Sequence, residues 1–304
     1  MVDRGQVQDL ASRAQQFRER VPVFRLGRLP VEQQLARVPA LAGLFWDLIG
    51  DCSPVFMPDP ELTSMARLVM PEDRRVNLYT PSGAIDAFIT PASPRQPIAD
   101  DESRVDRKSI HERLRELAGR FAKHFLTNDE EVKPERLWET KARGLTMKRE
   151  SSPVALLEVL GSLRRHVHGL PVLGRASIHV AVGAGNEVTK WGVDWRPREG
   201  AAVVETEVID PDEGARRILA ELQTRSPELK DTGRGGEPDR MTLGYLSMPR
   251  RVEQRMLQPA WVAMFRPKKG TTMGTVIAVA AAPSPYEPLG FPGRLSGLRE
   301  SPRD

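Results

Sequence analysis

The chain has 304 residues, 39% of them hydrophobic and only 6% aromatic, so it is long enough for two or three domains with small aliphatic cores. Its 45 basic and 41 acidic residues leave a net charge of +4, which is too small to predict nucleic-acid binding by itself. The single cysteine, Cys52, excludes an intrachain disulfide framework, and no apolar run is long enough to span a bilayer. Because the polar N-terminus lacks the apolar segment of a signal peptide, we expect a cytoplasmic protein, or an extracytoplasmic one whose leader was removed.

The first 50 residues predict helices on either side of a short strand. Apolar residues recur at helical spacing over residues 6–19, which predicts an amphipathic helix, and residues 21–26 are a strand candidate. Residues 31–49 predict a helix in two pieces, because Pro39 would remove a backbone hydrogen bond from the helix interior.

A hairpin and a linker follow. Residues 75–89 predict a β-hairpin with its turn at 81–83. Residues 91–108 are polar and rich in proline, which is typical of a linker. We therefore predict one small module before this linker and two after it, divided as 1–90, 91–108, 109–200, 201–282 and a flexible tail at 283–304.

The second half of the chain predicts two helices among several strands. Ser109, with Glu112 three residues later, matches a capping box and starts a strongly periodic helix that reaches Phe125. Asp210 followed by Pro211 marks another helix start. Residues 154–163 are ambiguous between helix and strand, and strands are predicted at 136–148, 242–248, 259–265 and 275–281. This order predicts an α+β fold with antiparallel sheets, each covered on one face by helices.

Residues 176–197 predict a second hairpin. Its turn is Gly185-Asn186, because both residue types tolerate positive φ. The returning strand carries Trp191 and Trp195 on one face, and its alternation slips between Val188 and Trp191, which predicts a β-bulge.

Residues 109–282 resemble a known family of noncatalytic modules. The segment HGLPVLGRASIHVAVGAGNEVTKW resembles the "GxPVxG" turn, strand, glycine turn and returning strand of thermolysin-type propeptides. The segment DPDEGARRILAEL at 210–222 is similar to the helix that opens a PepSY-type repeat. The matching positions are Gly169, Pro171, Val172, Gly174 and Gly185, and, at an "LxPAW" position near the end, Leu257, Pro259, Ala260 and Trp261.

The resemblance, which extends to YycI/YycH-like domains, implies tandem propeptide-like and PepSY-like modules. Modules of this kind act as inhibitors and intramolecular chaperones of a peptidase, or as regulatory binding domains. It implies no catalytic residues and no cofactor. The sequence also lacks an H-E-x-x-H zinc motif, so the peptidase half of such a protein is absent from it.

Three histidines form the candidate metal site. His166 and His168 lie on one side of an extended segment, and His179 follows on a nearby strand. Zinc accepts such ligands, so a metal-dependent enzyme built on these three residues is one alternative. The other reading is that they are surface and turn histidines in a basic segment.

Basic doublets and tryptophans motivate a second alternative, a nucleic-acid-associated module. Stacking on tryptophan and ion pairs with phosphate are how single strands are bound. The opposing reading is a set of solvated sheet edges with tryptophans in the core. The doublets are Arg164-Arg165, Arg216-Arg217, Arg250-Arg251 and Lys268-Lys269, interleaved with Trp191, Trp195 and Trp261.

The leading hypothesis is a noncatalytic binding or regulatory protein. The chain is rich in hairpins and poor in convergent reactive groups. It would hold a protein partner, such as a peptidase, through a sheet face or by adding a strand at a sheet edge. The predicted contact residues are Trp191 and Trp195, with Arg164 and Arg165 beside them.

Overall fold

The computed structural model divides the chain into two compact units. Unit 1 comprises residues 1–26, 198–248 and 255–304, and unit 2 comprises residues 27–197 and 249–254. The structure describes residues 3–47, 55–57, 64–70, 74–89, 98–99, 106–144, 151–225, 237–266 and 275–289.

The units divide the chain differently from the predicted modules. The predicted linker at 91–108 falls inside unit 2, and most of it lies outside the described residues. The boundary at 197/198 is close to the predicted one at 200/201. The first 26 residues belong with the C-terminal part of the chain, a long-range association that local patterns do not reveal.

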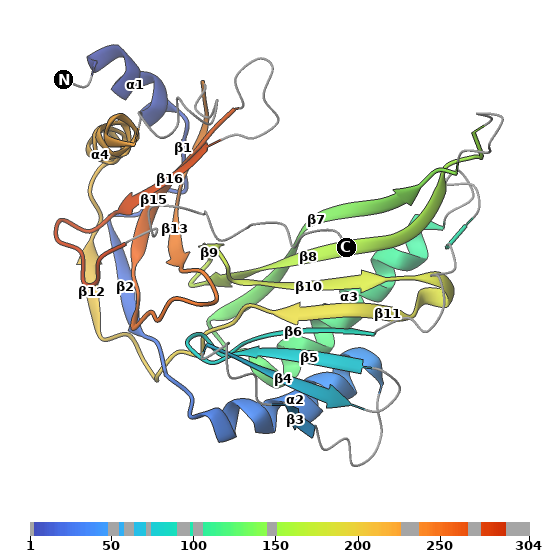
Figure 1. Ribbon diagram of the computed structural model, residues 1–304. Coiled ribbons are helices and arrows are strands. Elements are labelled where there is room, and N and C mark those ends of the chain that lie inside the picture. The colour runs from blue at the N-terminus through green and yellow to red at the C-terminus, as the bar shows by residue number, and fades with distance from the viewer. Residues whose placement is uncertain are drawn as a thin grey trace. The chain divides into compact units, whose positions relative to one another are not determined.

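Unit 2 is built on an antiparallel sheet with two helices on one face, α2 (Val31–Trp46) and α3 (Arg107–Phe125) (Figure 1). In spatial order the strands are β7 (Glu130–Ala142), β8 (Ala155–Val167), β10 (Ser177–Val182), β11 (Val188–Val193), β6 (Ala84–Ile89), β5 (Arg74–Tyr79), β4 (Met65–Met70) and β3 (Val55–Met57). A further strand, β9 (Leu170–Gly174), forms a hairpin with the end of β8. We call the face away from the helices the open face; Trp138, Ser162, His179 and Asp86 lie on it.

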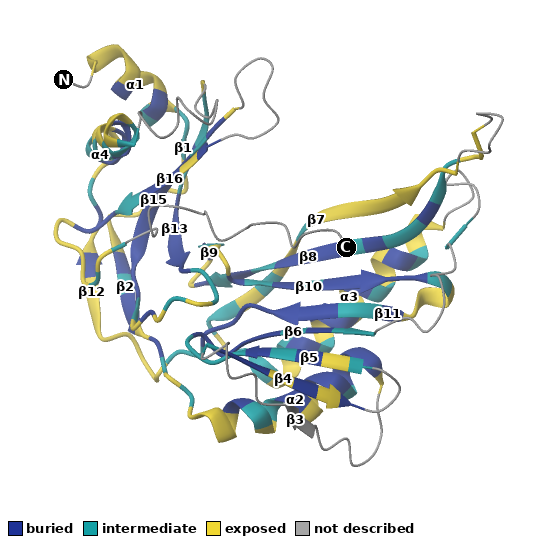
Figure 2. Ribbon diagram, in the orientation of Figure 1, coloured by how far each residue is buried: buried dark blue, intermediate teal, exposed yellow. Residues whose placement is uncertain are grey.

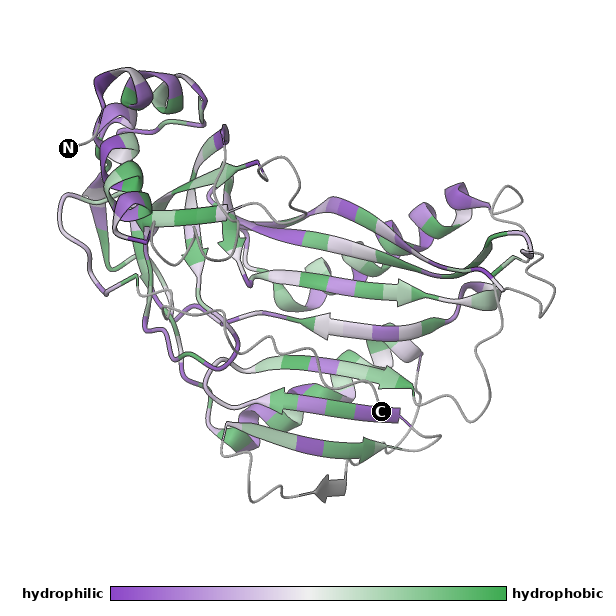
Figure 3. Ribbon diagram, turned by 45° about the horizontal axis from the view of Figure 1, so that its top comes forward, coloured by the Kyte–Doolittle hydropathy of each residue, from purple (hydrophilic) through white to green (hydrophobic). Residues whose placement is uncertain are grey.

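The core of unit 2 lies between this sheet and the helices. Apolar and more polar residues alternate along several strands (Figure 3). Every second side chain therefore faces α2 and α3. Trp191 is completely buried there, with its ring 5.1 Å from Phe45 and 5.3 Å from Trp46. Trp195 packs at 5.4 Å against Phe121 of α3. Each fully buried aromatic or aliphatic side chain contributes on the order of 1.5–3 kcal/mol.

The described residues of unit 1 form two sheets and two helices. In one sheet β16 (Thr275–Ala280), β15 (Pro259–Phe265) and β13 (Pro238–Ser247) are antiparallel, and β1 (Ala14–Gln15) pairs in parallel with β13. The other sheet has the order β12 (Val204–Glu207), β2 (Arg20–Arg25) and β14 (Met256–Leu257). The helices are α1 (Arg4–Ser12) and α4 (Pro211–Thr224), which contact each other. The two units together confirm the predicted α+β class.

Two predicted turns, the bulge and the helix cap at Asp210 are confirmed. The 75–89 hairpin forms as β5 and β6. Gly185 and Asn186 have φ values of 65° and 61° between β10 and β11. The bulge is present, because Val182 pairs with Val188 while Ala181 pairs with Lys190. Asp210 caps α4 by accepting a hydrogen bond from the Glu213 amide at 2.8 Å.

Other element predictions were wrong in extent. The first helix ends at Ser12 instead of continuing to residue 19. Helix α2 is continuous through Pro39, which lies on its exposed side, where solvent can hydrate the carbonyl that proline leaves without a donor. Asp106, rather than Ser109, caps α3, since its carboxylate accepts from the amides of Lys108 and Ser109.

The strands on either side of residue 150 differ from the prediction in their bounds. The ambiguous segment 154–163 lies mostly in β8, a strand of 13 residues. The predicted strand 136–148 overlaps β7 only at residues 136–142, because β7 begins at Glu130 and ends at Ala142; residues 143–144 are not strand, and 145–148 lie outside the described residues. Strands β7 and β8 form an antiparallel pair along almost their full length. The predicted strands at 242–248, 259–265 and 275–281 are confirmed as β13, β15 and β16.

Replacing Gly174 by valine is expected to lower the free energy of unfolding by more than about 1 kcal/mol, because a β-branched residue strongly disfavours positive φ. Gly174 has φ of +83° at the end of β9. Gly174→Asn is the control, since asparagine tolerates the left-handed region better, and should cost less. Chemical denaturation of both variants measures this, and a harmless Gly174→Val would contradict the turn assignment.

Candidate functional site

The predicted tryptophan contact surface does not exist. Trp191 lies in β11 and Trp195 follows two residues after its end, and both side chains are on the face covered by α2 and α3. Both indoles lie in the hydrophobic core, so neither is accessible to a partner. Alternation along a strand groups residues by face, but only helix packing decides which face is buried.

The two arginines predicted to contact a partner, Arg164 and Arg165, both form ion pairs with glutamates of unit 2. Arg165 is buried on the helix side, where it forms an ion pair with Glu130 and lies 4.3 Å from the ring centroid of Trp195. Arg164 binds both carboxylate oxygens of Glu135, at 2.6 and 2.7 Å. Neither guanidinium is therefore offered to a partner.

The three histidines do not converge on a metal site. His179 pairs with Ser162 across β8 and β10, so His166 lies four residues further along β8, roughly 13 Å away at the rise of a strand. His168 sits in the β8–β9 turn, 2.9 Å from Asp129. Burial lowers the pKa of His166 below its usual value. Among the described residues no group of three or more His, Cys, Asp or Glu side chains is suited to hold a metal ion.

Most arginines of the basic doublets pair with carboxylates. Arg216 and Arg217 both pair with Glu213 on α4. Arg250 pairs with Asp194. Lys268-Lys269 lies outside the described residues. Arg251 is exposed, and the nucleic-acid-associated module stays a prediction.

A polar row crosses the middle of the open face. Ser162 pairs with His179, His179 with Gly192, and Gly192 with Asp86, on four successive strands. His179 Nε2 lies 3.0 Å from Asp86 Oδ1, although β11 separates their strands. A side chain on Gly192 would overlap the imidazole, so glycine at this position allows the hydrogen bond to span β11. No local signal reveals this pair, because it depends on the order of the strands.

Arg250 joins the row from the segment 249–254. It forms an ion pair with Asp194, and its Nη1 lies 3.7 Å from Asp86 Oδ2. Its guanidinium also lies 5.1 Å from the ring centroid of Tyr79. Arg196 holds the same segment by donating to the carbonyls of Pro249 and Val252, at 2.9 and 2.7 Å.

The electrostatics of this cluster favour fixed ion pairs. Burial by itself would raise the pKa of Asp86, but the hydrogen bond from His179 and the charges of Arg250 and Lys190 outweigh it, and the pKa is lowered. Burial opposes the charge of Arg250, yet Asp194 and Asp86 raise its pKa above the usual value. Asp86 is therefore held as a bound carboxylate at neutral pH, whereas an efficient general base has a pKa near the working pH.

Replacing Gly192 by alanine is expected to lower the free energy of unfolding by about 1–3 kcal/mol, because the added methyl displaces His179 from Asp86. The control is the same substitution in a His179→Ala background, where the methyl no longer overlaps the imidazole and its nearest remaining neighbour is Asp86 Oδ1, at 3.0 Å. Urea denaturation of the four proteins gives the coupling energy. Equal costs in the two backgrounds would contradict this arrangement.

Strand β7 is the most exposed of the unit 2 strands whose burial the structure describes. Figure 2 shows it exposed along most of its length. Trp138 and Leu137 are 46% and 39% exposed, large fractions for apolar side chains near the middle of a strand. Among the described residues β7 pairs only with β8, so the backbone groups along its outer edge have no strand partner. Natural proteins usually protect such an edge, because it is a template for another strand.

The cross-strand pairs assign the faces of β7. Trp138 lies opposite Leu160 and Arg136 opposite Ser162, on the open face. Leu137 lies opposite Gly161, on the helix side, where a Cβ at Gly161 would come within 2.6 Å of Leu114. Exposed apolar side chains therefore flank the free edge on both faces.

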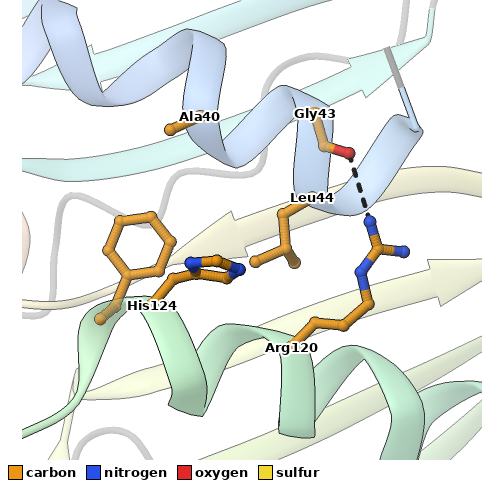
Figure 4. A pocket seen from close by; sticks show the side chains of 6 residues that line it. Ala40, Gly43, Leu44, Arg120 and His124 are labelled. Atoms are coloured by element: carbon orange, nitrogen blue, oxygen red, sulfur yellow. Dashed lines mark hydrogen bonds between the residues drawn. The ribbon is translucent and has the colours of Figure 1, made fainter. Parts of the chain in front are cut away.

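A second candidate is a cavity of about 430 Å³ between α2 and α3 (Figure 4). It is lined by Ala40, Gly43, Leu44, Arg120, His124 and Phe125. The guanidinium of Arg120 donates to Asp47 at 2.9 Å and to the carbonyl of Gly43 at 3.5 Å. Because the Arg120 guanidinium is already paired with Asp47, the cavity offers a ligand mainly apolar surface. It has few polar groups that could distinguish one ligand from another.

Comparisons with known proteins identify no family. No family model matches the chain, and no curated protein matches it. A crystal structure of an uncharacterized protein from Eubacterium rectale is similar over 87% of this chain and 83% of that one, with 11% identity and a TM-score of 0.42. The resemblance to propeptide and PepSY-type modules therefore stays a prediction.

No helix among the described residues is long and apolar enough to cross a membrane.

Proposed function

We propose that this chain is a noncatalytic, regulatory protein-binding module that holds an extended segment of a partner protein as an added strand on β7. The observation that carries the proposal is the outer edge of β7, with Trp138 and Leu137 exposed on its two faces. Added strands gain affinity from main-chain hydrogen bonds and specificity from alternate side chains. An inhibited or chaperoned peptidase, as the sequence resemblance implies, is one partner of this kind.

Two further features support a binding role over a catalytic one. The polar cluster on the open face consists of side chains bound to one another, with Asp86 and Asp194 both engaged by Arg250. Exposed aromatic residues such as Trp138 are the side chains that most often dominate the energy of protein interfaces.

The test is selection from a library of random decapeptides on the immobilised protein. The wild type is expected to enrich binding peptides, and Trp138→Lys should weaken them at least roughly tenfold, because aromatic anchors often contribute more than 1.4 kcal/mol.

The matched control is Val276→Lys on β16, where another exposed apolar residue (48%) lies on another edge strand. This variant should bind like the wild type. Failure to enrich any peptide, or peptides that survive Trp138→Lys but not Val276→Lys, would refute β7 as the docking edge.

A further inference from the structure

We infer that the segment held by β7 runs antiparallel to it and carries two apolar residues followed by an acidic residue. This inference rests on the proposed function and specifies its partner. It derives from the register of β7, from the pairing of its charges and from the orientation of its exposed side chains.

The regular part of the edge is short. The β7–β8 register shifts between Pro134 and Arg136 and again between Thr140 and Lys141. Between these two irregularities, residues 136–140 pair one-for-one with β8. An added strand that continues the sheet without its own bulge is therefore aligned by these five residues.

Every charged side chain of β7 except Arg136 forms an ion pair with another described residue. Four glutamates are paired: Glu130 with Arg165, Glu131 with Lys133, Glu135 with Arg164, and Glu139 with Arg107 and Lys141. Arg136 is exposed and forms no ion pair or hydrogen bond with any described residue. An acidic residue directly opposite Arg136 would complete the row of ion pairs, because opposite charges stabilise cross-strand pairs.

Two further properties of the added segment follow from β7: its residues opposite Leu137 and Trp138, and its direction relative to β7. Residues opposite Leu137 and Trp138 contact exposed apolar side chains on the two faces, so they are apolar. All strand pairs within unit 2 are antiparallel. In that direction the partner meets Trp138 first, then Leu137, then Arg136, which gives the order apolar, apolar, acidic.

A second copy of this chain fits the edge poorly. Pairing β7 with itself about Arg136 places two arginines opposite each other, and pairing about Leu137 places Glu135 opposite Glu139. Pairing about Trp138 places Leu137 opposite Glu139 and leaves Arg136 opposite Thr140. Like charges directly opposite disfavour the first two registers. The third pairs Trp138 with Trp138, but it sets an apolar residue against Glu139 and gives Arg136 no counter-charge, so a foreign segment with an acidic residue is the better occupant.

The experiment measures the fluorescence anisotropy of labelled decapeptides with the full chain. One peptide has valine, isoleucine and aspartate at its centre, a second has lysine in place of aspartate, and a third has the three residues reversed. The wild type should prefer the first over the second by roughly threefold to tenfold, because the exchange removes one exposed cross-strand ion pair and adds one repulsion of similar size. Arg136→Glu should reverse this preference, whereas Arg75→Glu, an exposed arginine on β5, should leave it unchanged.

The outcomes separate this inference from the proposed function. Equal binding of the first two peptides, abolished by Trp138→Lys, would overturn the acidic specificity while leaving β7 as the docking edge. Preference for the reversed peptide would overturn the antiparallel direction. If all three fail while library peptides still depend on Trp138, only the inferred sequence is wrong. If no peptide depends on Trp138, both proposals fail.

Discussion

Replacing Arg165 by leucine is expected to lower the free energy of unfolding by about 3–5 kcal/mol, because it removes one partner of a buried ion pair, the guanidinium bound to Glu130. The two side chains are only 2% and 3% exposed. Arg165 also donates to the carbonyl of Arg196 at 2.8 Å and packs on the ring of Trp195, so the substitution removes several interactions together.

The adjacent arginine provides a matched control. Arg164 pairs with Glu135 on the same two strands, but its side chain is 20% exposed. Arg164→Leu should therefore cost clearly less than Arg165→Leu, since solvent compensates the freed carboxylate. Chemical denaturation of the two variants compares them directly, and equal costs would contradict the buried ion pair.

The second large effect is expected for Arg250→Leu, which should cost about 3–5 kcal/mol at neutral pH. It removes the counter-charge of the buried Asp194 and one of the charges beside Asp86. Arg251, exposed and next in sequence, is the control, and Arg251→Leu should change the stability by less than about 0.5 kcal/mol.

The cost of Arg250→Leu should depend on pH in a defined direction. The pKa of Asp86 is lowered in the folded wild type, so its contribution to stability is complete above the unfolded pKa near 3.8 and is lost as pH falls below it. The stability difference between wild type and variant should therefore be constant near neutral pH and shrink below about pH 4. A difference that grows in acid would contradict the assigned ion pairs.

The elements that sequence analysis predicted well are those with local signals. The turn at Gly185-Asn186, the cap at Asp210 and the bulge after Val188 each arise from the conformational limits of a few neighbouring residues. The α+β class follows from the order of such elements. Cap assignment failed at Ser109 because Asp106, three residues earlier, offers a competing acceptor.

The polar row of His179 and Asp86 on the open face was not predictable from the sequence, because it depends on which strands are neighbours in the sheet. His179 and Asp86 are 93 residues apart and meet only because β10, β11 and β6 are adjacent. The prediction that Trp191 and Trp195 form a contact surface failed for the same reason, since the sequence does not say that α2 and α3 cover their face. The exposed Trp138 was overlooked because its strand was predicted without its position in the sheet.

The most direct test of strand addition to β7 is hydrogen–deuterium exchange of the full chain with and without a bound decapeptide. We expect slower exchange within residues 136–140 when the peptide is bound, because its carbonyls accept hydrogen bonds from outward-facing amides of β7. Exchange in the helices α2 and α3 should remain unchanged. Saturating peptide that leaves β7 unaffected, or protects the α2–α3 cavity instead, would contradict the account.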